Sequence, residues 1–333
     1  FEGNTSTTSD NNRGKMKISD IYKLSVEKGI EADPRGAERV QKLLERNLEK
    51  LEKLTGHEKE EFDQESLKNP YSDTRVLHVA DDREIKKVLV GIDIEAAEIL
   101  LAKELGDIDL VVAHHPSGRA VQDLHEVMDM QADILYSYGV PINVAEGLMR
   151  ERKSEVFRTW NPRNNWRAVD AARLLGVNFL CIHTAADNQA AKFLREKIEA
   201  EGPERVEDVM NALRGIEEYK RAIEMGAGPV ILSGKPENRC GTVYVGMTGG
   251  TEPPPKLYEK MAQAGIGTIV DMHIGEEHKK EAEAANMNIV VTGHMSSDSI
   301  GMNFILDELE RQGIEVVPCS GLIRVSRNAT QML

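Results

Sequence analysis

Apolar residues recur at two different spacings along the chain, and the two spacings alternate. Near the start they lie three and four residues apart, which predicts helices over 17–30 and 35–60, the second heavily charged. Residues 61–76, which include Pro70, are predicted to form a loop. From residue 86 onward, apolar runs of strand length alternate with helix-like segments. This alternation predicts an α/β fold with mainly parallel strands.

The elements of the alternating part follow from periodicity and from turn residues. Gly106 ends the first helix of the series, because glycine commonly ends a helix. A polar stretch with two tryptophans, 151–166, interrupts the pattern. The predicted strands are 86–93, 108–116, 140–146, 177–184, 241–250 with a glycine turn at its end, 268–275 and 288–295, and the apolar segment 315–321 closes the pattern. The predicted helices are 94–106, 121–138, 168–175, 188–202, 254–265, 276–285 and 296–313.

The length of 333 residues exceeds one ordinary hydrophobic core and predicts two domains or two intertwined halves. We expect a first α/β half over 16–135 with an extra charged N-terminal helix, and a middle segment over 136–235. A second half is expected over 236–333. Residues 1–15 are polar and lack the apolar region of a signal peptide, so we expect a disordered leader or a tag remnant.

Charge and composition restrict the classes of partner. The formal net charge of −14 argues against a nucleic-acid binder, which needs a basic surface for phosphates. No apolar run approaches the roughly 20 residues of a membrane span. The three cysteines are far apart and lack metal-binding spacing, so neither a disulfide framework nor a thiolate zinc site is expected. We therefore expect a cytoplasmic protein with a small-molecule substrate and no membrane or nucleic-acid partner.

Ligand-type residues follow several predicted strands, at the point where each strand ends. In open α/β sheets, binding sites gather at the carboxyl ends of the strands. Each of these motifs, taken alone, also has a structural interpretation, such as helix capping by Asp187 or Thr184. Three strand ends carry His114 with His115, His183 with Asp187, and His294 with Asp298, and a fourth carries His273. Their occurrence at one predicted edge favours a shared site.

The residue types at this edge indicate a metal centre. Imidazole and carboxylate together suit Zn, Mn, Fe, Ni or Co. Successive side chains of a strand diverge, so His114 and His115 are expected to serve different ions of a pair about 3.5–4 Å apart. A carboxylate between two such ions can bridge them. His294 and Asp298 are four residues apart and would share one face of a following helix.

The stretches GIDIEAAEILLAKELGDIDLVVAHHP, IHTAAD and VVTGHMSSDSIGMNFILDEL together resemble the Ngg-one-interacting-factor-three-like family. The resemblance covers roughly 86–135, 175–200 and 240–325, in the family's order. It implies two intertwined α/β halves, a ring-shaped hexamer and a dinuclear site. The implied ligands of two divalent ions are His114, His115, Asp187, His294 and Asp298. The family is also known as GTP cyclohydrolase I type 2.

The chain departs from the family pattern at three places. The family's last ligand is usually Glu, whereas this chain has Asp298, which is shorter by one methylene. The gap between His115 and Asp187 is longer than in small members, which leaves Glu146 as a second candidate carboxylate. The charged N-terminal helix has no family counterpart.

Two functions remain open from the sequence. The first is a metal-dependent hydrolase of a small nucleotide-like substrate, with His273 as a catalytic proton shuttle. The second is a metal-binding regulatory or scaffold protein that acts through protein contacts. The loop 246–251, GMTGGT, is either a tight turn or part of the site. The family resemblance and the apolar stripe of helix 35–60 predict a homo-oligomer.

Overall fold

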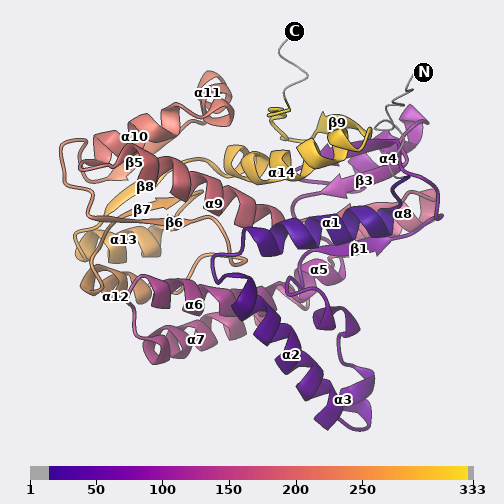
Figure 1. Ribbon diagram of the computed structural model, residues 1–333, viewed down its shortest axis with the longest axis horizontal. Helices are drawn as coiled ribbons and strands as arrows, with labels where there is room; N and C mark the ends of the chain where they lie inside the picture. The colour runs from indigo at the N-terminus through magenta and orange to yellow at the C-terminus, as the bar shows by residue number, and fades with distance from the viewer. Residues whose placement is uncertain (1–14, 329–333) are drawn as a thin grey trace, which may run out of the picture.

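Two β-sheets form the framework of the computed structural model, which describes residues 15–328 (Figure 1). The first sheet has the order β1-β4-β3-β2-β9, and the second has the order β5-β8-β7-β6. Only the edge strands β1 and β5 pair antiparallel among the described strands. This confirms the predicted α/β fold with mainly parallel sheets. The strands are β1 Arg75–His78, β2 Lys87–Gly91, β3 Leu110–Ala113, β4 Phe179–Cys181, β5 Val230–Ser233, β6 Thr242–Gly246, β7 Ile266–Asp271, β8 Asn288–Val291 and β9 Glu315–Cys319.

Helices connect the strands and cover the sheets (Figure 1). The first half contains α1 Ile18–Glu31, α2 Ala37–Lys53, α3 His57–Glu60, η1 Gln64–Leu67, α4 Ala96–Leu105, α5 Arg119–Gln122, η2 Leu124–Met128 and α6 Asp129–Ser137. The rest of the chain contains α7 Ile142–Trp160, α8 Arg167–Leu175, α9 Thr184–Glu201, α10 Val206–Arg214, α11 Glu217–Glu224, α12 Leu257–Gln263, α13 Glu276–Ala284 and α14 His294–Arg311. No helix in the described range is long and apolar enough to cross a membrane.

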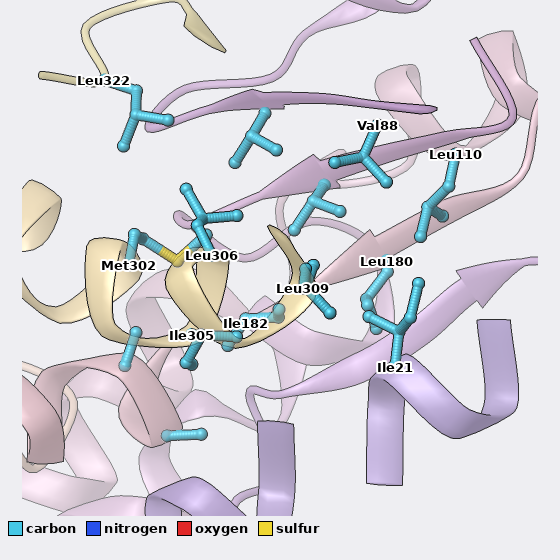
Figure 2. Packing of buried hydrophobic residues seen from close by; sticks show 14 of the residues in the cluster. Ile21, Val88, Leu110, Leu180, Ile182, Met302, Ile305, Leu306, Leu309 and Leu322 are labelled. Atoms are coloured by element: carbon cyan, nitrogen blue, oxygen red, sulfur yellow. The ribbon is translucent and has the colours of Figure 1, made fainter. Parts of the chain in front are cut away.

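Two long helices, α9 and α14, each contact both sheets. Met302, Ile305, Leu306 and Leu309 of α14 pack with residues of β2, β3 and β4 in one buried cluster (Figure 2). An earlier residue of α14, Ile300, joins a second cluster with residues of the other sheet. The helix α9 is divided in the same way, because its start belongs to the first cluster and its later turns to the second. The two helices therefore connect the hydrophobic cores of the two sheets.

A close contact between α9 and α14 depends on Gly301. A Cβ atom at this position would lie 2.2 Å from the carbonyl oxygen of Ala186, which is far inside contact distance. Because glycine has no side chain, the backbones of the two helices can approach each other here. The first turns of both helices carry predicted site residues, so this contact helps to fix the distance between them.

The predicted strand 140–146 is wrong. This segment begins α7, and the helix continues through most of the stretch predicted to interrupt the fold. Its buried residues Ala145, Met149 and Val156 are four and seven residues apart, which is helical spacing. Glu146 therefore lies on a helix, where it lines a surface cavity between α2 and α7, and not at a strand end.

Other boundaries also differ from the sequence prediction. The predicted helix 35–60 is broken into α2 and α3 around Gly56, which has φ +56° and favours a turn. The helices α9 and α14 begin earlier than predicted, at Thr184 and His294. The segment between α9 and β6 received no elements in the prediction, but it contains α10, α11 and β5.

The predicted domain boundaries stay a prediction, although the path of the chain bears on them. The strand β4 of the middle segment lies in the first sheet, whereas β5 of the same segment lies in the second sheet. The final strand β9 returns to the first sheet beside β2. Of the expected leader 1–15, residues 1–14 lie outside the described residues.

Candidate metal centre

The predicted ligands follow strands of both sheets, β3 and β4 of the first and β8 of the second, so the prediction of one shared sheet edge is wrong although the ligands meet. His114 and His115 directly follow β3. Asp187 lies in the first turn of α9, which begins soon after β4. His294 and Asp298 lie at the start of α14, which begins soon after β8. Gly293, with φ +93°, allows the chain to leave the strand and enter α14 directly.

Asp298 lies at the centre of this group. Its Oδ1 atom is 3.4 Å from Nε2 of His114, and its Oδ2 atom is 3.2 Å from Nε2 of His115. The same Oδ2 is 3.5 Å from Nε2 of His294. On the other side, Nε2 of His114 lies 3.3 Å from Oδ1 of Asp187. The fold thus brings all five predicted ligands together, although they span 185 positions of the chain, from 114 to 298.

Several polar atoms of this group are buried and have no hydrogen-bond partner among the described residues. They are Nε2 of His114, Oδ1 of Asp187 and both carboxylate oxygens of Asp298. A buried polar atom without a partner costs about 1–3 kcal/mol, and more if it is charged. Such atoms therefore fit a ligand that is bound between them. Nitrogen and carboxylate oxygen are the donors that divalent transition metals accept.

Two groups of three side chains have the spacing of metal ligands. The ligand atoms of His114, His115 and Asp298 all lie within 4.8 Å of one another. The same holds for His114, His183 and Asp187. These buried histidine and aspartate groups could hold a metal ion.

The Nδ1 atoms of the adjacent residues His114 and His115 also have hydrogen-bond partners. The Nδ1 of His114 lies 3.0 Å from the carbonyl oxygen of Ile182, to which it can donate a hydrogen bond. The Nδ1 of His115 lies 2.6 Å from Oδ1 of Asp93. In both cases Nε2 is left to face Asp298. Hydrogen bonds of this kind fix the tautomer and orientation of a metal-binding histidine. Asp93 was not predicted from the sequence as part of the site.

The carboxylates strongly affect the pKa values of the histidines. Burial lowers the pKa of His114, but the negative charges of the nearby Asp298 and Asp187 carboxylates raise it well above its usual value. Burial also lowers the pKa of His115, yet the nearby carboxylates of Asp298 and Asp93 raise it to about 9. Without a cation, this site therefore binds protons at neutral pH. A metal ion must displace them, so metal affinity increases as the pH rises.

His273, the predicted proton shuttle, lies beside the group without joining it. Its ring centroid is 4.9 Å from that of His294, and its Nδ1 is 3.0 Å from Oε1 of Glu252. The hydrogen bond to Glu252 raises the pKa of His273, although burial opposes this. Burial also raises the pKa of Asp271, two residues earlier, to about 7. Glu252 was missed in the sequence because it lies in a proline-rich loop, away from any strand end.

The glycine loop 246–251 contacts protein atoms on two sides. Gln131 of α6 donates hydrogen bonds to the carbonyl oxygens of Gly249 and Thr251, at 2.6 and 2.5 Å. The Thr248 hydroxyl donates a hydrogen bond to Oδ1 of Asn188 at 2.6 Å, and Asn188 directly follows Asp187. These contacts favour the tight-turn interpretation, because they tie the loop to α6 and α9.

The fold and the site define an α/β protein with a buried group of histidines and aspartates that could hold metal. The chain matches the crystal structure of a NIF3 superfamily protein from Sphaerobacter thermophilus with a TM-score of 0.70 and 29% identity, over 84% of this chain and 98% of that chain. Reduced HcgD from Methanocaldococcus jannaschii matches with a TM-score of 0.49 and 14% identity, over 73% of this chain and 87% of that chain. No protein-family model matches the chain, and no curated protein matches it. The predicted resemblance to the Ngg-one-interacting-factor-three-like family, abbreviated NIF3, is confirmed.

Proposed function

We propose that the protein binds two divalent metal ions and acts as a metal-dependent hydrolase of a small, nucleotide-like substrate. The observation that carries the proposal is Asp298, which is 1% exposed. Both of its oxygens lack a hydrogen-bond partner among the described residues, and they lie between His114 on one side and His115 and His294 on the other. A carboxylate in this position suits a bridge between two ions.

The balance of buried charge supports the same proposal. Asp73, Asp187 and Asp298 are all buried, and each forms ion pairs only with histidines in the described part of the chain. Burying a carboxylate is costly unless a positive charge compensates it. Protonated histidines supply some of that charge, but partial burial lowers the pKa of His294. Divalent ions would neutralise the carboxylates and leave the histidines neutral.

The distances suggest which residues hold which ion. His114, Asp187 and Asp298 would hold one ion, which is called the inner ion because these residues are buried. His115, His294 and Asp298 would hold the other, called the outer ion. The side chains of His115 and His294 are 29% and 44% exposed, so a substrate can approach the outer ion. The donors suit Zn, Mn, Fe, Ni or Co.

Two adjacent ions supply a water molecule with a lowered pKa and polarise the bond to be cleaved. The protein's own residues would orient the reaction. His115 is held by Asp93, and His273 is held by Glu252 with its other ring nitrogen left to exchange a proton. The side chain of His273 is 51% exposed, so it can reach both the site and solvent. His273 is therefore proposed as the proton shuttle.

The variant His115→Ala tests the proposed hydrolase activity. The variant should lose at least about 100-fold in turnover of GTP or a related nucleotide, since a removed ligand leaves the outer ion unfixed. Turnover is measured with added Zn or Mn, and His57→Ala is the control because His57 is exposed on α3, with 93% of its side chain accessible. If wild type binds metal but turns over no nucleotide, the regulatory or scaffold function is favoured instead.

We also propose a homo-oligomer built from dimers. The amphipathic helix α2 buries only Val40, and Leu48 on the same helix is 49% exposed. An apolar stripe that its own chain leaves accessible is a candidate contact surface. Sedimentation should give a species larger than the monomer. A monomer at micromolar concentration would contradict this proposal.

A further inference from the structure

A further histidine, His183, lies next to the proposed inner ion. It is the N-cap residue of α9 and directly precedes the first turn that carries Asp187. The residue is 7% exposed, and its ring centroid is 5.0 Å from that of His114. One of its ring nitrogens belongs to the group that brings His114, His183 and Asp187 within 4.8 Å of one another, and its Nδ1 lies 3.9 Å from Oδ2 of Asp187. Its position is therefore compatible with binding the same ion.

A buried carboxylate holds the far side of the His183 ring. The Nδ1 atom lies 2.7 Å from Oδ2 of Asp73, a residue that is fully buried. Thr184 donates to the same carboxylate twice, from its hydroxyl at 2.6 Å and from its backbone N–H at 3.3 Å. The backbone N–H of His183 donates to the hydroxyl of Thr74, at 3.1 Å. These bonds fix both the ring and the loop that supplies Asp73.

The hydrogen bond to Asp73 determines what the other ring nitrogen can do. A carboxylate only accepts hydrogen bonds, so Nδ1 of His183 carries the proton. In the neutral ring, Nε2 then has a free lone pair, which is the form that binds metal. The hydrogen bond at Nδ1 is of the same kind as at His115, where Asp93 holds Nδ1 and Nε2 faces Asp298. Carboxylate–histidine pairs of this kind are typical of metal centres.

We propose that His183 is an additional ligand of the inner ion and that Asp73 is its positioning residue; this inference rests on the proposed dinuclear site. The inner ion would then have four protein ligands, namely His114, His183, Asp187 and Asp298. The outer ion would have three, namely His115, His294 and Asp298. A site with four protein ligands is closed, whereas a site with three retains an open position for substrate. The inner ion is thus structural and tightly held, and the outer ion faces the substrate.

The alternative is that His183 only forms a buried ion pair with Asp73 and caps α9. The variant His183→Asn separates the two roles. The amide nitrogen of asparagine occupies a position similar to that of Nδ1, so it can still donate to Asp73, but it provides nothing in place of Nε2. The ion pair is replaced by a hydrogen bond, and the possible metal ligand is removed.

The experiment is a titration of the metal-free protein with Co²⁺, in competition with a chelator and monitored by the absorption of the bound ion. His183→Asn should weaken binding of the tighter ion by more than tenfold and change its absorption spectrum. Asp73→Asn should weaken binding of the same ion by about 10–100-fold, as expected for a residue that forms a hydrogen bond with a metal ligand. His125→Asn is the control, because His125 is also largely buried but pairs with Glu126 on η2.

Unchanged affinity and an unchanged spectrum in His183→Asn would overturn the inference. If His183→Asn does not fold, the wild-type protein decides the question by NMR of the Co²⁺ form. A shifted ring N–H signal assigned to His183 is expected beside those of His114 and His115, and its absence while those two are shifted would exclude His183. A wild-type protein that binds no Co²⁺ would instead overturn the dinuclear site itself, and the inference with it.

Discussion

Asp298→Asn is expected to abolish the simultaneous binding of two metal ions. A neutral amide cannot balance two divalent charges, and only one of its two polar atoms can act as a ligand. Both carboxylate oxygens of Asp298 lie within 3.5 Å of histidine nitrogens, so both proposed ions lose a ligand at once. We expect a drop from two bound ions to at most one, with its affinity lowered by at least about 100-fold. Elemental analysis and competitive titration with a chelator measure both effects.

The control for this variant is Asp298→Glu, which restores the residue usual in the resembled family and keeps the charge. We expect it to retain two ions, since the added methylene needs only a small shift of the first turn of α14. If Asp298→Asn binds two ions as tightly as the wild type, Asp298 is not a ligand. The site would then have to be mononuclear or use another carboxylate. Glu146 cannot take this role from a strand end, because it lies on α7.

His114→Ala is expected to lose the inner ion while the chain stays folded. Its imidazole is fully buried, and its Nε2 has no hydrogen-bond partner among the described residues, so it contributes little to the fold through that atom. Removing it leaves Asp187 and Asp298 close together without their shared cation. We therefore expect lower thermal stability as well as metal loss. A metal ion at a free concentration of 100 times its dissociation constant stabilises the fold by about 2.7 kcal/mol, and the variant would lose this contribution.

The matched variant is His294→Ala, in which the more exposed ligand is removed. It should lose the outer ion but retain the inner one, with a smaller effect on stability. Circular dichroism and thermal melting, with and without a chelator, distinguish metal loss from misfolding. If either variant were insoluble while its folded fraction bound metal normally, the histidines would be structural residues and not ligands.

The sequence was sufficient to predict the α/β fold because parallel strands and helices leave a clear alternation of apolar runs. It failed at 140–146, where four apolar residues in seven resembled a strand. The buried residues Met149 and Val156, which reveal the helical spacing, lie beyond those seven positions. The edge strands β1 and β5 were missed for a related reason. They are short and partly exposed, so their residues do not form the apolar runs of a central strand.

The predicted ligands could be selected from the sequence because they share one feature, a position just after a parallel strand. The residues that form hydrogen bonds with the site histidines have no such feature. Asp93 follows β2 but was not singled out, and Asp73 lies in a loop before an antiparallel edge strand. Only the fold brings Asp73 to His183 across 110 positions of the chain. Hydrogen-bonding partners of this kind are determined by tertiary structure and leave no local pattern.

The most direct test of the account is the metal content of the purified protein, expressed as ions per chain. The account predicts close to two transition-metal ions per chain, or one if the outer ion is lost during purification and is restored by added Mn or Zn. The unpartnered oxygens of Asp298 and the buried carboxylates of Asp73, Asp187 and Asp298 are the observations behind this prediction. A protein that remains free of metal after soaking in Mn or Zn would contradict the proposed centre.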